Sequence, residues 1–311
     1  MRRLLAGALA ALFASASTAV VAATPVVPKG MPLQVAATLR DIGAKIDGAR
    51  TGLLYAPLLP QEPYQGVNLA RDLVYGPHER HRLDVFAPPA RGKGRPVVVF
   101  VHGGGFSRGA KRAAGAPFYD NIGLWAAAND AVGITVNYRL APQFGYPAGV
   151  EDLTRVVAWV RAHAAQFGGD PSKIYLWGHS AGGAHVADYI VRTKKPGIAG
   201  AVLTSGIYTL GQTVSAWKDY YGEDVSRYAE RESLPLLGVS PVPLLVTCAE
   251  LDPESFLADC EALIKARAAA GAPTQSLRLP AHSHISETYA VGTEDESLSA
   301  PVLQFIRETP R

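Results

Sequence analysis

The chain has 311 residues, of which 48% are hydrophobic and 18% charged. This composition supports a large buried core and excludes a disordered or polyelectrolyte protein. The formal net charge is +3, and two of the positive charges, Arg2 and Arg3, lie in a segment that we expect to be removed. The remaining chain has no lysine- or arginine-rich run, so nothing in it predicts nucleic-acid or membrane-surface binding.

Residues 1–23 have the pattern of a secretory signal peptide. Arg2 and Arg3 precede an uncharged, Ala- and Leu-rich stretch that ends Val21-Ala22-Ala23, with small side chains where a signal peptidase cleaves. We therefore expect an exported protein, periplasmic or secreted. An uncleaved anchor is the alternative, because about 20 apolar residues can span a bilayer. No later apolar run reaches that length, so we expect no stable membrane insertion of the mature chain.

The mature chain divides into an arm and one large domain. Residues 24–65 are rich in Pro and Gly, contain one weakly periodic stretch at 33–46, and predict an N-terminal arm or short cap. Residues 66–311 show no linker-like stretch and predict a single domain. Continuous apolar runs such as 97–101 suit strands that are covered on both faces.

Strands and helices are predicted to alternate along this domain. Strands are expected at 67–75, 81–86, 96–101, 132–138, 173–177, 200–205, 243–248 and 275–279. Helices are expected at 115–129, 147–167, 181–192, 254–270 and 297–307. This alternation predicts an α/β fold with a mainly parallel, eight-stranded sheet and right-handed crossovers.

Ser180 is the predicted nucleophile. Residues 178–182 match G-x-S-x-G, in which small neighbours let a serine occupy a strained turn between a strand and a helix. The same pattern also fits residues 105–109 around Ser107, and a tight Gly-rich turn is the alternative interpretation of either match. Context favours Ser180, because an apolar strand precedes it and an apolar helix follows it.

The segment His102–Phe106 is the predicted oxyanion hole. Its three consecutive glycines leave backbone N–H groups unshielded, and such groups can stabilise a developing negative charge. Gly104 and Gly105, together with Ala181 after the serine, are the expected donors. A phosphate-binding loop is the rival interpretation, but Ala110 stands where that motif needs lysine. We expect the histidine that begins the segment to hold the loop by hydrogen bonds.

A nucleophilic serine needs a basic histidine. Only His185, His282 and His284 follow Ser180 in the chain, and with this type of serine turn the histidine comes last. His185 lies on the helix that the serine begins, so we interpret it as a helix-face residue. We favour His284 as the base and keep His282 as the alternative. A zinc site built on His282 and His284 lacks an obvious third and fourth ligand.

The base in turn needs an orienting carboxylate. The predicted strand at 243–248 runs into Glu250 and Asp252. A carboxylate just beyond the end of a parallel strand is well placed for a site at that edge of the sheet. We favour Asp252 and keep Glu250 in reserve.

Five motifs occur together in a characteristic order. They are HGGGF at 102–106, NYRLAP at 137–142, GHSAGG at 178–183, ELDP at 250–253 and HSH at 282–284. Over about residues 70–311 the chain resembles α/β-hydrolase-fold esterases of the hormone-sensitive-lipase-like and bacterial carboxylesterase groups. HRLDVF at 81–86 also resembles esterases related to kynurenine formamidase.

This resemblance implies a catalytic triad of Ser180, Asp252 and His284, with no metal or organic cofactor. It also implies that the N–H groups of Gly104, Gly105 and Ala181 bind the oxyanion. Many relatives have His followed by Gly-Phe or Phe, whereas this chain has His284-Ile285-Ser286, which keeps the His282 alternative open.

We therefore expect a serine carboxylesterase acting on small to medium esters. An amidase or formamidase with the same triad is the alternative, and a non-catalytic binding module would require a broken triad. The oligomeric state is not predicted. Cys248 and Cys260 are 12 residues apart, and we favour two buried thiols over a disulfide.

Overall fold

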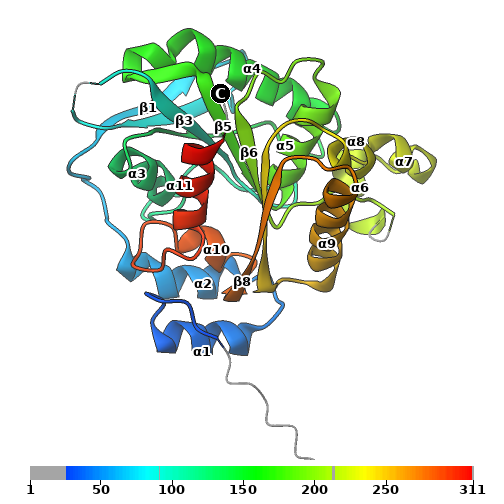
Figure 1. Ribbon diagram of the computed structural model, residues 1–311, viewed down its shortest axis with the longest axis horizontal. Coiled ribbons are helices and arrows are strands. Elements are labelled where there is room, and N and C mark those ends of the chain that lie inside the picture. Colours follow the sequence, from blue (N-terminus) through cyan, green and yellow to red (C-terminus); the bar gives the residue numbers. More distant parts are fainter. Residues whose placement is uncertain (1–25, 91, 212–213, 310–311) are drawn as a thin grey trace, which may run out of the picture.

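The computed structural model describes residues 26–90, 92–211 and 214–309. The expected signal peptide at 1–23 lies outside the described residues. Figure 1 shows a central sheet with helices on both faces, and the N-terminal helices lying across one end of it. Within the described ranges, no helix combines the length and the apolar composition needed to cross a membrane.

The predicted eight-stranded, mainly parallel sheet is confirmed. Its spatial order is β1-β2-β4-β3-β5-β6-β7-β8. The strands are β1 (Asn68–Val74), β2 (Arg82–Ala87), β3 (Arg95–Val101), β4 (Val132–Val136), β5 (Gly169–His179), β6 (Gly200–Thr204), β7 (Leu244–Leu251) and β8 (Thr274–Ser283). Pairing is antiparallel between β1 and β2 and between β2 and β4, and parallel from β4 through to β8.

The continuous apolar strands are buried on both faces, as expected. In β3, Val97, Val99 and Val101 belong to one core cluster, and the alternating Val98 and Phe100 belong to another. The first cluster includes side chains of α4 (Ala148–His163), α5 (Ala181–Arg192) and α9 (Glu254–Ala269). The second includes side chains of α3 (Asp120–Ala128) and α11 (Ser299–Glu308). One short 3-10 helix, η2 (Ala164–Phe167), follows α4.

The arm folds against the domain. It contains α1 (Leu33–Ile42), α2 (Gly48–Tyr55) and η1 (Ala56–Leu58). Leu39 and Tyr55 are fully buried and pack in one cluster with Ala281 near the end of β8 and Ala290 just after α10 (Ser286–Tyr289). In Figure 1 α2 lies beside α10, and α1 packs against β8. The arm is therefore anchored at the edge of the sheet where the parallel strands end.

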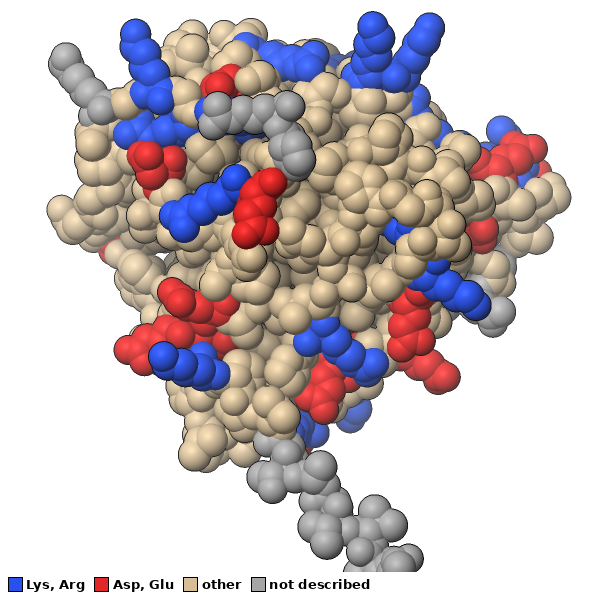
Figure 2. All heavy atoms as spheres, viewed as in Figure 1, with Lys and Arg blue, Asp and Glu red and all other residues tan. Residues whose placement is uncertain are grey.

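The chain between β6 and β7 is helical, which the sequence pattern did not predict. It contains α6 (Val214–Tyr221), η3 (Val225–Arg227), α7 (Tyr228–Arg231) and α8 (Leu234–Gly238). Tyr220 and Tyr221 are buried in a cluster with Phe106 from the loop after β3. Acidic and basic side chains are interspersed on the face shown in Figure 2, where neither sign forms a continuous stripe.

Cys248 and Cys260 form a disulfide, so the prediction of two free thiols is wrong. Cys248 lies in β7 and Cys260 in α9, and α9 packs back along β7. This packing brings the two Cα atoms to 6.4 Å, within the range that a disulfide can bridge. A sequence spacing of 12 cannot show how a helix returns along its strand.

Candidate active site

The predicted site residues lie just beyond the carboxyl ends of four parallel strands. The oxyanion segment follows β3, Ser180 follows β5, Asp252 follows β7 and His284 follows β8. Because these ends share one edge of the sheet, residues far apart in sequence meet there.

Ser180 occupies a sharp turn between β5 and α5. Its φ of 56° and ψ of −123° place a non-glycine residue at positive φ, which costs conformational energy and is typical of a nucleophile held in a strand-to-helix turn. The turn requires small neighbours. A Cβ on Gly103 would lie only 3.0 Å from the Ser180 Cβ, and a Cβ on Gly182 would collide with the Val101 carbonyl.

Asp252 and His284 form a buried pair. The Nδ1 of His284 lies 2.7 Å from Oδ1 of Asp252. The other carboxylate oxygen accepts hydrogen bonds from the Ser205 hydroxyl at 2.6 Å and the Ala249 N–H at 2.8 Å. These donors fix the carboxylate, so that Nδ1 donates to it and Nε2 of His284 is left as the basic nitrogen.

The alternatives from the sequence lie elsewhere. Glu250 accepts a hydrogen bond from the Ala281 N–H at 2.6 Å. The ring of His282 lies within hydrogen-bond distance of Ser286 and Ser297, and 3.1 Å from Asp295. His284, and not His282, therefore contacts Asp252.

One further candidate for the base, His185, and one for the nucleophile, Ser107, can also be placed. His185 is buried in α5 among Phe106, Tyr138 and Tyr220, and burial lowers its pKa to about 4. It is a packed helix residue, as expected from its position. Ser107 is exposed.

Ser180 and His284 line the same cavity, which has a volume of about 390 Å³. Its walls include Gly103, Gly104 and Gly105, together with the apolar side chains Ile46, Trp217, Phe256 and Ile285. Nε2 of His284 is buried and has no hydrogen-bond partner among the described residues. It is therefore free to take a proton from a group inside this cavity.

Three backbone N–H groups lie at or next to this cavity: Gly104 and Gly105 line it, and Ala181 directly follows Ser180, which also lines it. Ala181 is the first residue of α5, so its N–H has no partner within the helix. Gly104 and Gly105 adopt φ values of 127° and 58° in the loop after β3, and their N–H groups donate to no described residue. The positive end of the α5 dipole adds to the attraction for an anion.

Two buried histidines hold this arrangement together. His179 Nε2 lies 2.7 Å from the carbonyl oxygen of His284 and donates to it. His102 Nδ1 donates to the Gly103 carbonyl at 2.6 Å. Burial lowers the pKa of each ring to about 3, so both are neutral at pH 7. We expected the structural role of His102, whereas the contact of His179 with His284 was not foreseen.

Glu287 is a buried carboxyl group beside the pair. It is fully buried, and its Oε1 lies 3.7 Å from Nε2 of His179. Burial raises the pKa of Glu287 well above its usual range, and the charge of Asp252 raises this pKa further. A protonated Glu287 brings no second negative charge close to His284. Sequence reasoning gave no signal for this residue.

One group of side chains among the described residues has spacing that could suit a metal ion. The ligand atoms of His179, His284 and Glu287 lie within 4.8 Å of one another. However, Nε2 of His179 and Nδ1 of His284 are already engaged with the His284 carbonyl and with Asp252. The hydrogen bonds of this cluster suit an organised histidine base better than a metal centre.

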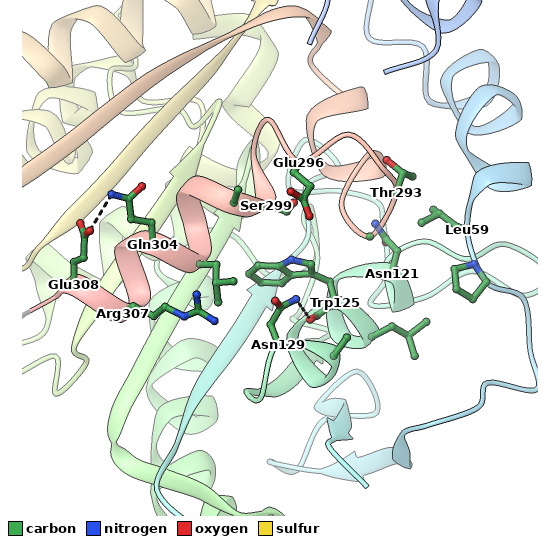
Figure 3. Close-up of a pocket in the computed structure, with 16 residues that line it drawn as sticks. Leu59, Asn121, Trp125, Asn129, Thr293, Glu296, Ser299, Gln304, Arg307 and Glu308 are labelled. Atoms are coloured by element: carbon green, nitrogen blue, oxygen red, sulfur yellow. Dashed lines mark hydrogen bonds between the residues drawn. The ribbon is translucent and has the colours of Figure 1, made fainter. Parts of the chain in front are cut away.

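A larger cavity of about 620 Å³ lies between α3 and α11 (Figure 3). Trp125 lies at its centre, and Glu296, Asn129 and Arg307 stand around it. No histidine or cysteine lines it, and neither Ser180 nor His284 reaches it. The predicted catalytic residues line only the smaller of these two cavities.

Comparisons of sequence find similarity to esterases over part of the chain. The family model BD-FAE matches residues 83–209. The chain is 35% identical over 152 residues to a probable isoprenylcysteine alpha-carbonyl methylesterase of Arabidopsis thaliana, covering 49% of this chain and 33% of that protein. It is 43% identical over 100 residues to a carboxylesterase of Mycobacterium tuberculosis, covering 32% of this chain and 30% of that protein. The chain thus spans about a third of the length of these two relatives.

Solved structures extend the similarity to most of the chain. A bacterial heroin esterase is 25% identical, with a TM-score of 0.69, covering 89% of this chain and 98% of its own. An esterase of the bacterial hormone-sensitive lipase family is 24% identical, with a TM-score of 0.65, covering 89% and 97%. The fold of this chain is therefore that of the α/β-hydrolases, as the resemblance of its motifs implied.

Proposed function

We propose that this chain, an α/β-hydrolase of the hormone-sensitive-lipase-like esterase group, is a serine carboxylesterase that acts through an acyl-enzyme on Ser180. One observation carries the proposal. Ser180, at a positive-φ turn, lines the same cavity as His284, and Nδ1 of His284 is hydrogen-bonded to the buried Asp252.

The proposed reaction begins with attack of the Ser180 hydroxyl oxygen on the ester carbonyl carbon. Nε2 of His284 takes the hydroxyl proton, and Asp252 stabilises the imidazolium through Nδ1. The N–H groups of Gly104, Gly105 and Ala181 stabilise the oxyanion, and losing one such donor typically costs about 3 kcal/mol of transition-state stabilisation.

Collapse of this intermediate breaks the bond to the alcohol oxygen. His284 returns the proton to that oxygen, and the alcohol leaves. A water molecule then attacks the acyl-enzyme with His284 again as the base, which releases the carboxylic acid and regenerates Ser180.

The cavity supports substrates of small to medium size. About 390 Å³ is near the lower end of the range for small-molecule sites. Ile46, Trp217 and Phe256 give it apolar walls, which suit short alkyl or aryl groups. We propose small-molecule carboxylic esters as the substrate class.

We also propose that the protein is exported after cleavage of residues 1–23. The Cys248–Cys260 disulfide supports this location, because disulfides persist mainly in oxidising compartments. Fractionation of cells that express the full chain, followed by N-terminal sequencing, tests this proposal. An exported protein that begins at Thr24 is expected, and a full-length protein retained in the cytoplasm would contradict it.

Substitution of the nucleophile tests the proposed activity. Ser180→Ala should lower kcat for 4-nitrophenyl acetate by at least about a thousandfold, because the acyl-enzyme cannot form. Ser107→Ala is the matched control and should hydrolyse the ester normally. Full ester hydrolysis by the Ser180 variant would refute the proposal. Faster turnover of formanilide than of all the esters would instead point to a formamidase.

A further inference from the structure

The cavity at Ser180 carries one permanent charge. Among the residues that the structure describes, Arg108 lines it and no carboxylate does. His179 also lines the cavity, but its pKa of about 3 leaves it neutral at pH 7. Apart from Arg108 and the two histidines, the side chains of the wall are apolar, aromatic or carry only a hydroxyl group. A ligand in this cavity therefore meets a positive charge at one point and no negative side chain.

The charge of Arg108 is not compensated within the protein, in contrast with the cations that follow it. Lys111 pairs with Asp84 at 2.6 Å and with Asp72 at 2.7 Å. Arg112 pairs with Asp72 at 3.0 Å. Arg108 is exposed, and its guanidinium makes no ion pair or hydrogen bond with any part of the chain that the structure describes. Of these three cations, it alone is left to bind a group from outside.

The backbone fixes Arg108 relative to the reacting atoms. Its N–H donates to the Gly104 carbonyl at 3.1 Å, which closes a tight turn beside the proposed oxyanion hole. The turn leaves no room for a side chain at Gly104, because a Cβ there would collide with the Arg108 carbonyl. The side chain of Arg108 therefore starts from a backbone position that is held beside Gly104, at the wall of the cavity that Ser180 also lines.

We propose that Arg108 binds an anionic group of the substrate, so that the preferred esters carry an ionised carboxylate a few bonds from the ester carbonyl. This inference rests on the proposed esterase function. A guanidinium can bind a carboxylate through two parallel hydrogen bonds. The apolar walls of the cavity keep part of the solvent away from this pair and strengthen it.

Two pairs of substrates of matched shape test the proposal, one for each side of the ester. Monomethyl adipate and methyl hexanoate differ in a carboxylate on the acyl side. The pair 4-acetoxybenzoate and 4-methylphenyl acetate differ in a carboxylate on the alcohol side. The readout is the ratio of kcat/KM for the anionic ester to kcat/KM for the neutral ester, followed by titration of the released acid. Each variant then serves as its own reference for folding and intrinsic reactivity.

In at least one pair, Arg108→Gln should lower this ratio about tenfold, chiefly through KM. Arg108→Lys should keep an intermediate ratio, because it retains the positive charge but lacks the planar guanidinium that forms two parallel hydrogen bonds. Arg112→Gln removes the same charge four residues away and should keep the wild-type ratio. High salt should shrink the wild-type preference, because it screens the pair.

The failures of the two proposals are distinguishable. If Ser180-dependent hydrolysis of the neutral esters is normal and the ratios are the same in wild type and Arg108→Gln, the role of Arg108 is overturned and the esterase function stands. An equal fall of the ratio in Arg112→Gln would also overturn it, because the effect would then be one of net charge. If no ester is hydrolysed, the proposed function itself fails.

Discussion

At the scale of single residues, several side chains of the sequence motifs form hydrogen bonds that hold the backbone around the site in place. Asp152 accepts hydrogen bonds from the N–H and the guanidinium of Arg139, both at 2.8 Å. It also contacts His81 Nε2 at 2.9 Å. The Asn137 side chain accepts from the Lys111 N–H at 2.6 Å. Asp152 of α4 thus joins the HRLDVF and NYRLAP segments, and Asn137 joins NYRLAP to the loop that follows the glycines. The motifs therefore contain residues that support the site as well as residues proposed to react.

The sequence predicts residues whose position follows from chain order, and it misses those that act through tertiary contact. Ser180, Asp252 and His284 each follow a predicted strand, which made them candidates. His179 bonds to a carbonyl 105 residues further along the chain. Glu287 comes close to Asp252 because α10 packs against β8. Neither contact leaves a local pattern.

The two histidines of the HSH segment should respond differently to substitution. His284→Gln should lower kcat/KM by about a thousandfold or more while the fold is retained, because it removes the base. His282→Gln should keep kcat within about tenfold and lower the melting temperature, because Ser286 and Ser297 lose a buried partner. Ester kinetics and circular dichroism on both variants check this. The opposite pattern would make His282 the base.

The carboxyl group of Asp188 should make the free energy of unfolding depend on pH. It is buried in α5, and burial raises its pKa to about 7 from an ordinary 3.8. In the folded state the carboxyl keeps a proton that the unfolded chain has lost. The contribution of Asp188 to stability is therefore full below about pH 4 and is lost as the pH rises to about 7, at up to about 1.4 kcal/mol per pH unit.

Asp188→Asn removes this titration and keeps the shape of the side chain. The free energy of unfolding of the variant, minus that of the wild type, should increase as the pH rises from about 4 to about 7. Above that range the difference should stay constant. Urea unfolding across this range measures the difference. Parallel curves for the two proteins would show that Asp188 titrates alike in the folded and unfolded states.

At the scale of elements, length and periodicity decided what could be predicted. The eight strands and the five long helices of the domain carry apolar runs or stripes that can be recognised in isolation. Helices α7, α8 and α10 have only four or five residues each, too few for a periodic pattern. They are helical because their surroundings stabilise them, as for Leu237 of α8, which is fully buried against the main core.

The disulfide joins two elements that flank the site. Cys248 lies in β7, four residues before Asp252, and Cys260 lies in α9. Closing a loop of this length restricts the unfolded chain, so replacing both residues by Ala should lower the free energy of unfolding by about 3 kcal/mol. Denaturant unfolding with and without reductant measures this. If reductant leaves the wild-type midpoint unchanged, the bond contributes no stability.

At the scale of the whole molecule, the N-terminal arm forms part of the wall of the cavity at Ser180. Ile46 and Gly48 line the cavity at Ser180, and the helices on either side of them are anchored by buried apolar side chains. The Pro and Gly content of residues 24–65 predicted an arm but gave no sign that it reaches the site. That placement follows from packing between the arm and the ends of strands more than 200 residues away.

One buried and one exposed leucine on α1 test the anchoring of the arm. Leu39 is fully buried, whereas Leu33 is 77% exposed. Leu39→Ala should lower the free energy of unfolding by about 3 kcal/mol and shift the loss of ester hydrolysis to lower temperature. Leu33→Ala should change stability by less than about 0.5 kcal/mol. Equal effects of the two substitutions would mean that the arm is not packed as described.

Chemical labelling tests directly whether Ser180 is the nucleophile. A fluorophosphonate reacts with an activated serine and leaves a stable covalent adduct, which peptide mass spectrometry locates. We expect one adduct per chain, on the peptide that contains Ser180, with ester hydrolysis lost in parallel. An adduct on Ser107, or hydrolysis that persists once Ser180 is fully labelled, would contradict it.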